Sequence, residues 1–130
     1  HRNPREGFMA LSLLHFRTAI ILAIIAAGLS LWMTATHDFR AMPAEIALNV
    51  LGWASFMLYG LYYRAVQMTA GGLERVHYAV ALIGVALAAV GIAGTEWGHV
   101  LFDPLRVIGA IIVALGFVLF GMIVFRPRAA

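Results

Sequence analysis

The sequence predicts an all-α integral membrane protein, a single bundle of four transmembrane helices that run up, down, up and down. Three observations predict this fold. The 130-residue chain is 63% hydrophobic and only 12% charged, a composition that requires lipid as its solvent. It contains four uncharged stretches of 18 or 19 residues, and about 20 apolar residues in a helix cross a bilayer core. Its basic residues gather near the ends of these stretches.

The first two helices are expected at about residues 10–36 and 44–68. The stretch at 18–36 is too long for the apolar region of a signal peptide, and no small-residue cleavage site follows it. Pro43 favours the start of the second helix, because a proline is tolerated in a first turn, where its missing N–H would have no partner.

The third and fourth helices are expected at about residues 74–95 and 104–126. Gly71 and Gly72 interrupt the chain before the third helix, and Asp103 is a favoured residue for capping the fourth. All connections are short, and short connections join antiparallel neighbours. We therefore expect one transmembrane domain over residues 1–130.

The arginines predict the orientation. Alternating loops place Arg40 and Arg106 on one side and seven arginines on the other: Arg2, Arg5, Arg17, Arg64, Arg75, Arg126 and Arg128. Basic residues in short loops stay on the cytoplasmic side. Both termini are therefore expected in the cytoplasm, with the protein in a bacterial inner membrane.

The composition also argues against several classes of function. The chain has no cysteine, which excludes disulfides, thiolate metal sites, iron–sulfur clusters and covalently attached haem. No lysine or acid lies well inside a span, so a pump or secondary transporter is not expected. A small-solute channel or carrier is the weakest alternative, since few polar groups are present to line a pathway.

Small residues predict where the helices pack. In lipid, helices associate where small side chains allow close approach. The candidate packing residues are Gly52, Gly84, Ala88, Gly91, Gly109 and Gly116. We expect these faces to pack within the bundle, with a homodimer seam as the alternative. Asn49, about one turn into the second helix, is expected to hydrogen-bond another helix.

Two histidines form a candidate cofactor site. His15 and His77 fall near the cytoplasmic ends of the first and third helices, which run parallel and lie diagonally in a simple bundle. Opposed histidines across a bundle can hold a b-type haem through both axial positions. The alternative is that each ring lies in the headgroup layer.

The outer loops contain a second candidate site. His37, Glu45 and His99, with Glu96 and Asp103 nearby in sequence, could converge on a divalent cation. Two imidazoles with carboxylates suit zinc or copper. The alternative is that they are ordinary polar residues at a membrane surface.

Residues 37–64 read HDFRAMPAEIALNVLGWASFMLYGLYYR and contain two motifs. Residues 48–53 match the end of H-A-H-L-N-L-L-G-W at all but one position, and residues 60–64 match G-L-Y-Y-R. Arg75, His77 and Tyr78 match a later R-x-H-[FY]. On these motifs the chain resembles a family of small bacterial four-helix membrane proteins related to the catalytic subunit of haem-copper oxidases.

The resemblance implies a shared helix-packing scaffold, while the copper ligands of the oxidases differ. Glu45 and Ala47 replace the two motif histidines, and no His-His pair follows the third helix. Catalysis by this chain alone is therefore not expected.

Together these patterns favour a non-catalytic subunit that packs against and stabilises a larger membrane complex of a respiratory or photosynthetic electron-transfer chain. Its expected partners are the lipid bilayer and other integral membrane subunits, with no nucleic acid. Such a subunit needs no cofactor. The alternative is a small membrane protein that binds haem b or a divalent metal.

Overall fold

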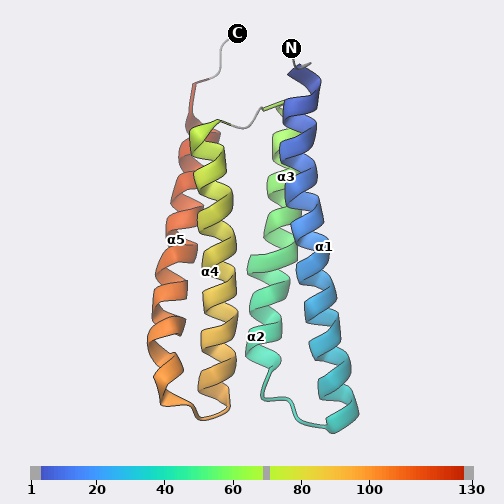
Figure 1. The fold of residues 1–130 in the computed structure, drawn as a ribbon, viewed down its shortest axis with the longest axis vertical. Helices are drawn as coiled ribbons and strands as arrows, with labels where there is room; N and C mark the ends of the chain where they lie inside the picture. Colours follow the sequence, from blue (N-terminus) through green and yellow to red (C-terminus); the bar gives the residue numbers. More distant parts are fainter. Residues whose placement is uncertain (1–3, 69–70, 128–130) are drawn as a thin grey trace.

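The computed structural model describes residues 4–68 and 71–127 and consists of four long antiparallel helices (Figure 1). The first is α1 (Pro4–Thr36). The second is continuous but changes its winding, from α2 (Met42–Ala47) through the π-helix η1 (Leu48–Ala54) to α3 (Ser55–Ala65). The third is α4 (Gly72–Glu96), and a short 3₁₀ turn, η2 (Val100–Phe102), leads into α5 (Asp103–Phe125). The predicted all-α four-helix fold is confirmed.

The helix ends follow local chemistry. Pro43 and Pro104 each lie in the first turn of a helix. At the start of α4 the Gly71 N–H donates to Oε2 of Glu74 at 2.9 Å, so the glutamate side chain caps its own helix. The first helix begins at Pro4, six residues earlier than the hydropathy pattern suggests. Hydropathy misses these residues because a helix that leaves the bilayer no longer has to be apolar.

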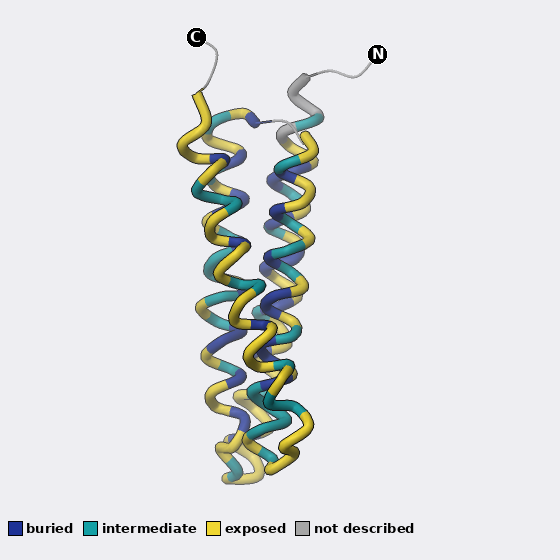
Figure 2. Tube along the Cα trace, turned by 90° about the vertical axis from the view of Figure 1, so that its left-hand side faces the viewer, coloured by how far each residue is buried: buried dark blue, intermediate teal, exposed yellow. Residues whose placement is uncertain are grey.

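All four helices are long and apolar enough to cross a membrane, over Met9–Thr36, Met42–Ala65, Gly72–Glu96 and Val100–Phe125. Their outward faces carry large apolar side chains; Leu31 and Leu58 are 73% and 65% exposed. Exposed residues follow the outside of every helix in Figure 2. A soluble protein does not present such a surface to water. The chain is a multi-pass membrane protein with lipid around it.

The bundle consists of two helical hairpins. The second helix packs along α1, and α5 packs along α4 over its whole length. Between the hairpins, the backbones approach most closely where α2 and η1 lie against α4. In Figure 1 this contact lies in the half of the bundle away from the N and C labels.

Glycines make the contact between α4 and α5 close. A Cβ atom added at Gly84 would lie 2.8 Å from the backbone nitrogen of Val113. One at Gly91 would meet the backbone of Arg106, and one at Gly109 would meet the backbone of Ala88. The small-residue faces of α4 and α5 therefore pack against each other. This is the packing within the bundle that the sequence predicts.

The remaining packing glycines are less tightly enclosed. A Cβ at Gly116 would lie 3.5 Å from Cα of Ala81, an ordinary van der Waals contact. At Gly52, in η1, it would lie 3.3 Å from Cδ1 of Leu22 on α1. Each therefore has somewhat more room than the glycines at the centre of the α4–α5 contact.

The core changes character along the bundle. In the half where the hairpin backbones approach each other, the buried residues are mainly alanines: Ala26, Ala41, Ala44, Ala47, Ala88 and Ala89. In the half near the termini, the buried residues are large and partly polar: His15, Phe56, Tyr59, Tyr63 and His77. Aromatic and imidazole rings therefore fill the wider space between the hairpins.

Candidate functional site

The histidine pair lies inside the wider half of the bundle. The side chains of His15 on α1 and His77 on α4 are both 0% exposed. Their ring centres are 6.0 Å apart and their planes differ by only 13°. The structure thus brings the two residues together and encloses both rings. Both rings therefore face the interior of the bundle and not the surrounding lipid.

Each histidine uses one ring nitrogen and leaves the other unpaired. Nδ1 of His15 lies 2.9 Å from the carbonyl oxygen of Leu11, and a carbonyl only accepts, so this nitrogen carries the hydrogen. Nδ1 of His77 lies 2.9 Å from the hydroxyl of Tyr63. The Nε2 atoms of both histidines are buried and have no hydrogen-bond partner among the described residues.

An unpaired buried nitrogen costs free energy, about 1–3 kcal/mol for each such group. The pattern has a known use, however. Histidines that bind a metal through one nitrogen nearly always hold the other in a hydrogen bond, which fixes the ring and its tautomer. Leu11 and Tyr63 stand in that supporting position for His15 and His77. In neutral His15, Nδ1 carries the ring hydrogen, so Nε2 is unprotonated and its lone pair is available to a metal ion.

Aromatic rings surround the pair. The ring centre of Tyr59 lies 6.1 Å from that of His15 and 4.6 Å from that of His77. Tyr63 lies 4.9 Å and 6.2 Å from the same two rings. Tyr78 packs on His15 at 5.1 Å and Phe120 on His77 at 5.1 Å. Two tyrosines therefore flank the space between the imidazoles.

The b-type haem that the sequence suggests does not fit this packing. Neither imidazole has any exposed surface, so not even a water-sized sphere reaches the rings. A porphyrin held by both histidines would occupy the plane between them, where Tyr59 and Tyr63 flank the axis. It would have to displace both rings. A single ion needs much less room.

A buried ion pair closes the terminal end of the site. The Glu74 side chain is 2% exposed, and its Oε1 accepts a hydrogen bond from Arg126, which follows α5. Its other oxygen accepts from Gly71. The negative charge of Glu74 is therefore balanced by the positive charge of Arg126, and the site gains no unpaired negative charge from it. The pair also joins the end of α5 to the start of α4.

Sequence reasoning missed Glu74 and Tyr63 as parts of this site. Glu74 is one turn before His77, and its position after Gly71 is a capping pattern that the sequence does contain. Tyr63 belongs to the G-L-Y-Y-R match. No pattern in the sequence, however, indicates that Tyr63 points at His77 across the two helices.

The outer polar residues remain separate. Among residues 4–68 and 71–127, no three His, Asp or Glu side chains lie together as a metal-ligand group. His37, Glu45 and His99 are therefore not brought together as a three-ligand cluster. Glu45 instead accepts a hydrogen bond from Asn49 at 3.4 Å, and the ring of His99 packs on Phe102.

The prediction for Asn49 requires correction. Its amide oxygen accepts from Nε1 of Trp53 at 2.7 Å, and its amide nitrogen donates to Glu45. Both partners are four residues away on the same continuous helix, where side chains at this spacing are neighbours. The amide is thus satisfied locally, and within the described part of the chain it makes no bond to another helix.

The segment that carries the family resemblance has unusual geometry. Residues 48–53 of the motif fall in η1, and π-helical turns are frequent at functional sites. Ser55, the first residue of α3, donates its hydroxyl to the carbonyl of Val50 in η1, five residues back, at 2.7 Å. η1 therefore sits directly before Phe56 and Tyr59, the first aromatic residues beside the histidines.

At the end of the bundle opposite the termini, Arg40 links the connection before α2 to the connection after α4. Its guanidinium donates to both carboxylate oxygens of Asp38, and it lies 4.8 Å from the ring centre of Trp97. These hydrogen bonds lower the pKa of Asp38 below its ordinary value. The charge of Asp38 therefore supports the folded turn above the ordinary pKa of an aspartate, and this support is lost as the pH falls through the lowered pKa.

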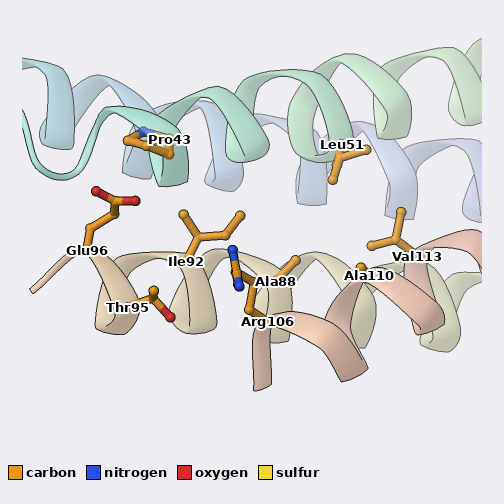
Figure 3. Close-up of a pocket in the computed structure, with 9 residues that line it drawn as sticks. All are labelled: Pro43, Leu51, Ala88, Ile92, Thr95, Glu96, Arg106, Ala110 and Val113. Carbon is orange, nitrogen blue, oxygen red and sulfur yellow. The ribbon is translucent and has the colours of Figure 1, made fainter. Parts of the chain in front are cut away.

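A groove of about 410 Å³ lies between the hairpins at this end of the bundle (Figure 3). Its floor is apolar, with Leu51, Ala88, Ile92, Ala110 and Val113, and its open end carries Pro43, Thr95, Glu96 and Arg106. A second groove, of about 320 Å³, lies on the other face of the same contact, and residues such as Leu22, Leu48, Ala86 and Ala89 line it. The two grooves flank the alanine-rich contact of α2 and η1 with α4.

No protein-family model, no curated protein and no solved structure matches this chain.

Proposed function

We propose that this chain is a membrane protein that holds one monovalent copper ion between His15 and His77. One observation carries the proposal: two fully buried imidazoles, 6.0 Å apart, each fix Nδ1 in a hydrogen bond and leave Nε2 without a partner among the residues that the structure describes. Imidazole nitrogen is a common ligand of copper, zinc, iron and nickel. The choice among these metals depends on charge and on geometry.

Charge favours a monovalent ion. Both ligands are neutral when they bind metal, and the nearby carboxylate of Glu74 is already paired with Arg126. The exposed guanidinium groups of Arg17 and Arg75 belong to residues only two positions from the histidines. A divalent ion would bring two uncompensated positive charges into this enclosed site, and isolated charge is costly to bury. Copper(I) brings one.

Coordination number also favours copper(I). The site offers two imidazole nitrogens, and copper(I) accepts two ligands, whereas zinc almost always takes four. The ring centres are 6.0 Å apart and the ring planes are stacked, so a bound ion requires each ring to turn its Nε2 toward the other.

The surrounding residues hold the ligands and exclude water. Leu11 fixes the tautomer of His15, and the Tyr63 hydroxyl orients His77. The rings of Tyr59, Tyr78 and Phe120 close the sides. Bound copper supplies a one-electron redox couple or a transferable metal ion. We further propose that both termini face the cytoplasm of a bacterial cell, which puts the site near the reducing side of its inner membrane.

Metal analysis of the purified protein tests the proposal. The protein in detergent is loaded with copper(I) under reducing conditions and freed of excess metal with a copper(I) chelator. We expect about one copper per chain, and none in His15→Leu or His77→Leu. His99→Leu, in an exposed outer position, is the matched control and should keep its copper. Far-ultraviolet circular dichroism verifies that each variant folds.

Two results would contradict the copper site. The first is wild-type protein that retains no copper while its helical content is intact. The second is a Soret band from stoichiometric haem in protein purified from a haem-replete host, lost in both histidine variants. That second outcome would mean that Tyr59 and Tyr63 move aside for a porphyrin.

A second candidate function is that of an accessory subunit of a larger membrane complex, such as one of a respiratory or photosynthetic electron-transfer chain. The outer face of α5 favours it, because a continuous row of large apolar side chains is exposed there: Ile108, Ile111, Leu115, Val118 and Met122. The polar connections are too short to form a catalytic domain of their own. Purification from native membranes in mild detergent should recover companion subunits, and repeated recovery of the chain alone would count against this role.

A further inference from the structure

The outer groove has the charge pattern of a phospholipid site. Its apolar floor runs along the helices and opens between α2–η1 and α4–α5. Arg106 lies in the first turn of α5 and points into this groove in Figure 3, and Glu96 lies closer to the open end. From the membrane interior outward, the lining is thus apolar, then cationic, then anionic.

Arg106 has donors to spare. Its Nη2 is 4.0 Å from Oδ1 of Asp103, at the outer limit of an ion pair. The same carboxylate oxygen accepts a hydrogen bond from the hydroxyl of Thr95 at 2.8 Å. A guanidinium has five N–H donors and matches phosphate oxygens two at a time. Arg106 can therefore bind a phosphate without breaking a strong contact.

The register of α4 against α5 fixes the relative depth of the two charges. The backbone of Arg106 packs against Gly91, and Glu96 lies five residues further along α4. At about 1.5 Å per residue, Glu96 is about 7–8 Å closer to the outer surface. A zwitterionic lipid has this order: acyl chains in the core, then a phosphate, then an ammonium group.

We propose that the groove binds one aminophospholipid of the outer leaflet, with an acyl chain on Leu51 and Val113, its phosphate on Arg106 and its ammonium on Glu96. A phosphatidylethanolamine-type headgroup fits both charges, because its primary ammonium has three N–H donors that can bind the carboxylate of Glu96. A choline headgroup has no N–H to donate. A purely anionic headgroup would face Glu96 with like charge.

The second groove provides an internal comparison. It has a similar volume and lies on the opposite face of the same helix contact. Its lining consists of Leu, Ile, Val and Ala side chains only. It can take an acyl chain but has no charged group to choose a headgroup.

Native mass spectrometry with defined lipids tests the site. Phosphatidylethanolamine, phosphatidylcholine and phosphatidylglycerol with identical acyl chains are titrated in turn into the delipidated protein. We expect one phosphatidylethanolamine to bind about tenfold more tightly than either of the others, and Arg106→Gln to abolish this advantage. Glu96→Gln should retain phosphate binding but shift the preference to phosphatidylglycerol. Arg40→Gln, outside the groove, should change nothing.

Two variants, each of which fills one groove with a large side chain, test whether the selective lipid binds in the first groove. Ala110 and Ala86 are exposed alanines that line the first and the second groove. Ala110→Phe should remove the selective lipid, and Ala86→Phe should leave it bound. Equal binding of the three lipids by the wild type, or an unchanged preference in Arg106→Gln, would overturn the proposal.

Discussion

The contact of α4 with α5 gives the sharpest prediction for the fold, through the substitution Gly84→Ala. The new Cβ would lie 2.8 Å from the nitrogen of Val113 and 3.1 Å from the carbonyl carbon of Ile112. Both are backbone atoms, so no side chain can rotate away. To restore an ordinary contact the helices must separate by about 0.6 Å.

The cost follows from this displacement. A gap of about 0.5–1 Å forfeits a quarter to a half of the dispersion attraction between the atoms on either side. Overpacking of this kind typically costs about 1–3 kcal/mol. The better helix propensity of alanine offsets about 0.5–1 kcal/mol. Gly84→Ala should therefore destabilise the protein by about 1 kcal/mol, and by no more than about 2.5 kcal/mol.

The control is Gly116→Ala in the same interface. There the new Cβ meets Cα of Ala81 at 3.5 Å, which needs no movement, so this variant should be neutral or slightly stabilised. The measurement is reversible unfolding in mixed micelles as the fraction of sodium dodecyl sulfate rises. If the two variants unfold at the same detergent fraction, the close approach of α4 and α5 at Gly84 is refuted.

Three further substitutions test the terminal half of the bundle by the same unfolding measurement. Tyr63→Phe removes the hydroxyl that contacts Nδ1 of His77, and should cost about 1–3 kcal/mol because that buried nitrogen loses its partner. Arg126→Gln leaves the carboxylate of Glu74 buried without its cation, with a cost of similar size. Gln67→Gly should be neutral or stabilising by up to about 1 kcal/mol, because Gln67 has a φ of 53°.

Each of these predictions has its own control. Tyr62→Phe changes a neighbouring tyrosine that is only partly buried, and should have a smaller effect than Tyr63→Phe. The double variant Glu74→Gln with Arg126→Gln should recover part of the stability lost in Arg126→Gln, because no charge is left buried. Gln67→Val should destabilise, since a β-branched residue is strained at positive φ. The opposite order in any pair would contradict the corresponding contact.

The membrane fold could be predicted because lipid imposes it. A span must be apolar and helical along its whole length, so hydropathy alone located the four helices. The glycines of α4 and α5 were likewise readable as packing residues, since close approach in lipid requires small side chains. The early start of α1 at Pro4 was not readable, because this part of the helix carries charges and no apolar stretch.

The site could be predicted only in part. Polarity and helix position identified His15 and His77 as a pair, but their depth in sequence suggested the headgroup layer. Whether a ring faces lipid or the interior depends on the rotation of each helix. Here both rings face the interior, among the aromatic residues of α3. The prediction for Asn49 failed for a related reason. Glu45 and Trp53, on the same helix, form the hydrogen bonds of its side-chain amide.

The most direct test of the copper site is X-ray absorption at the copper edge of the protein loaded with copper(I). Linear coordination by His15 and His77 predicts two nitrogen neighbours at about 2 Å, with the multiple scattering of imidazole rings. The signal should disappear when either histidine is replaced by leucine. A first shell of four ligands, or one with oxygen or sulfur neighbours that survives in both variants, would contradict the account.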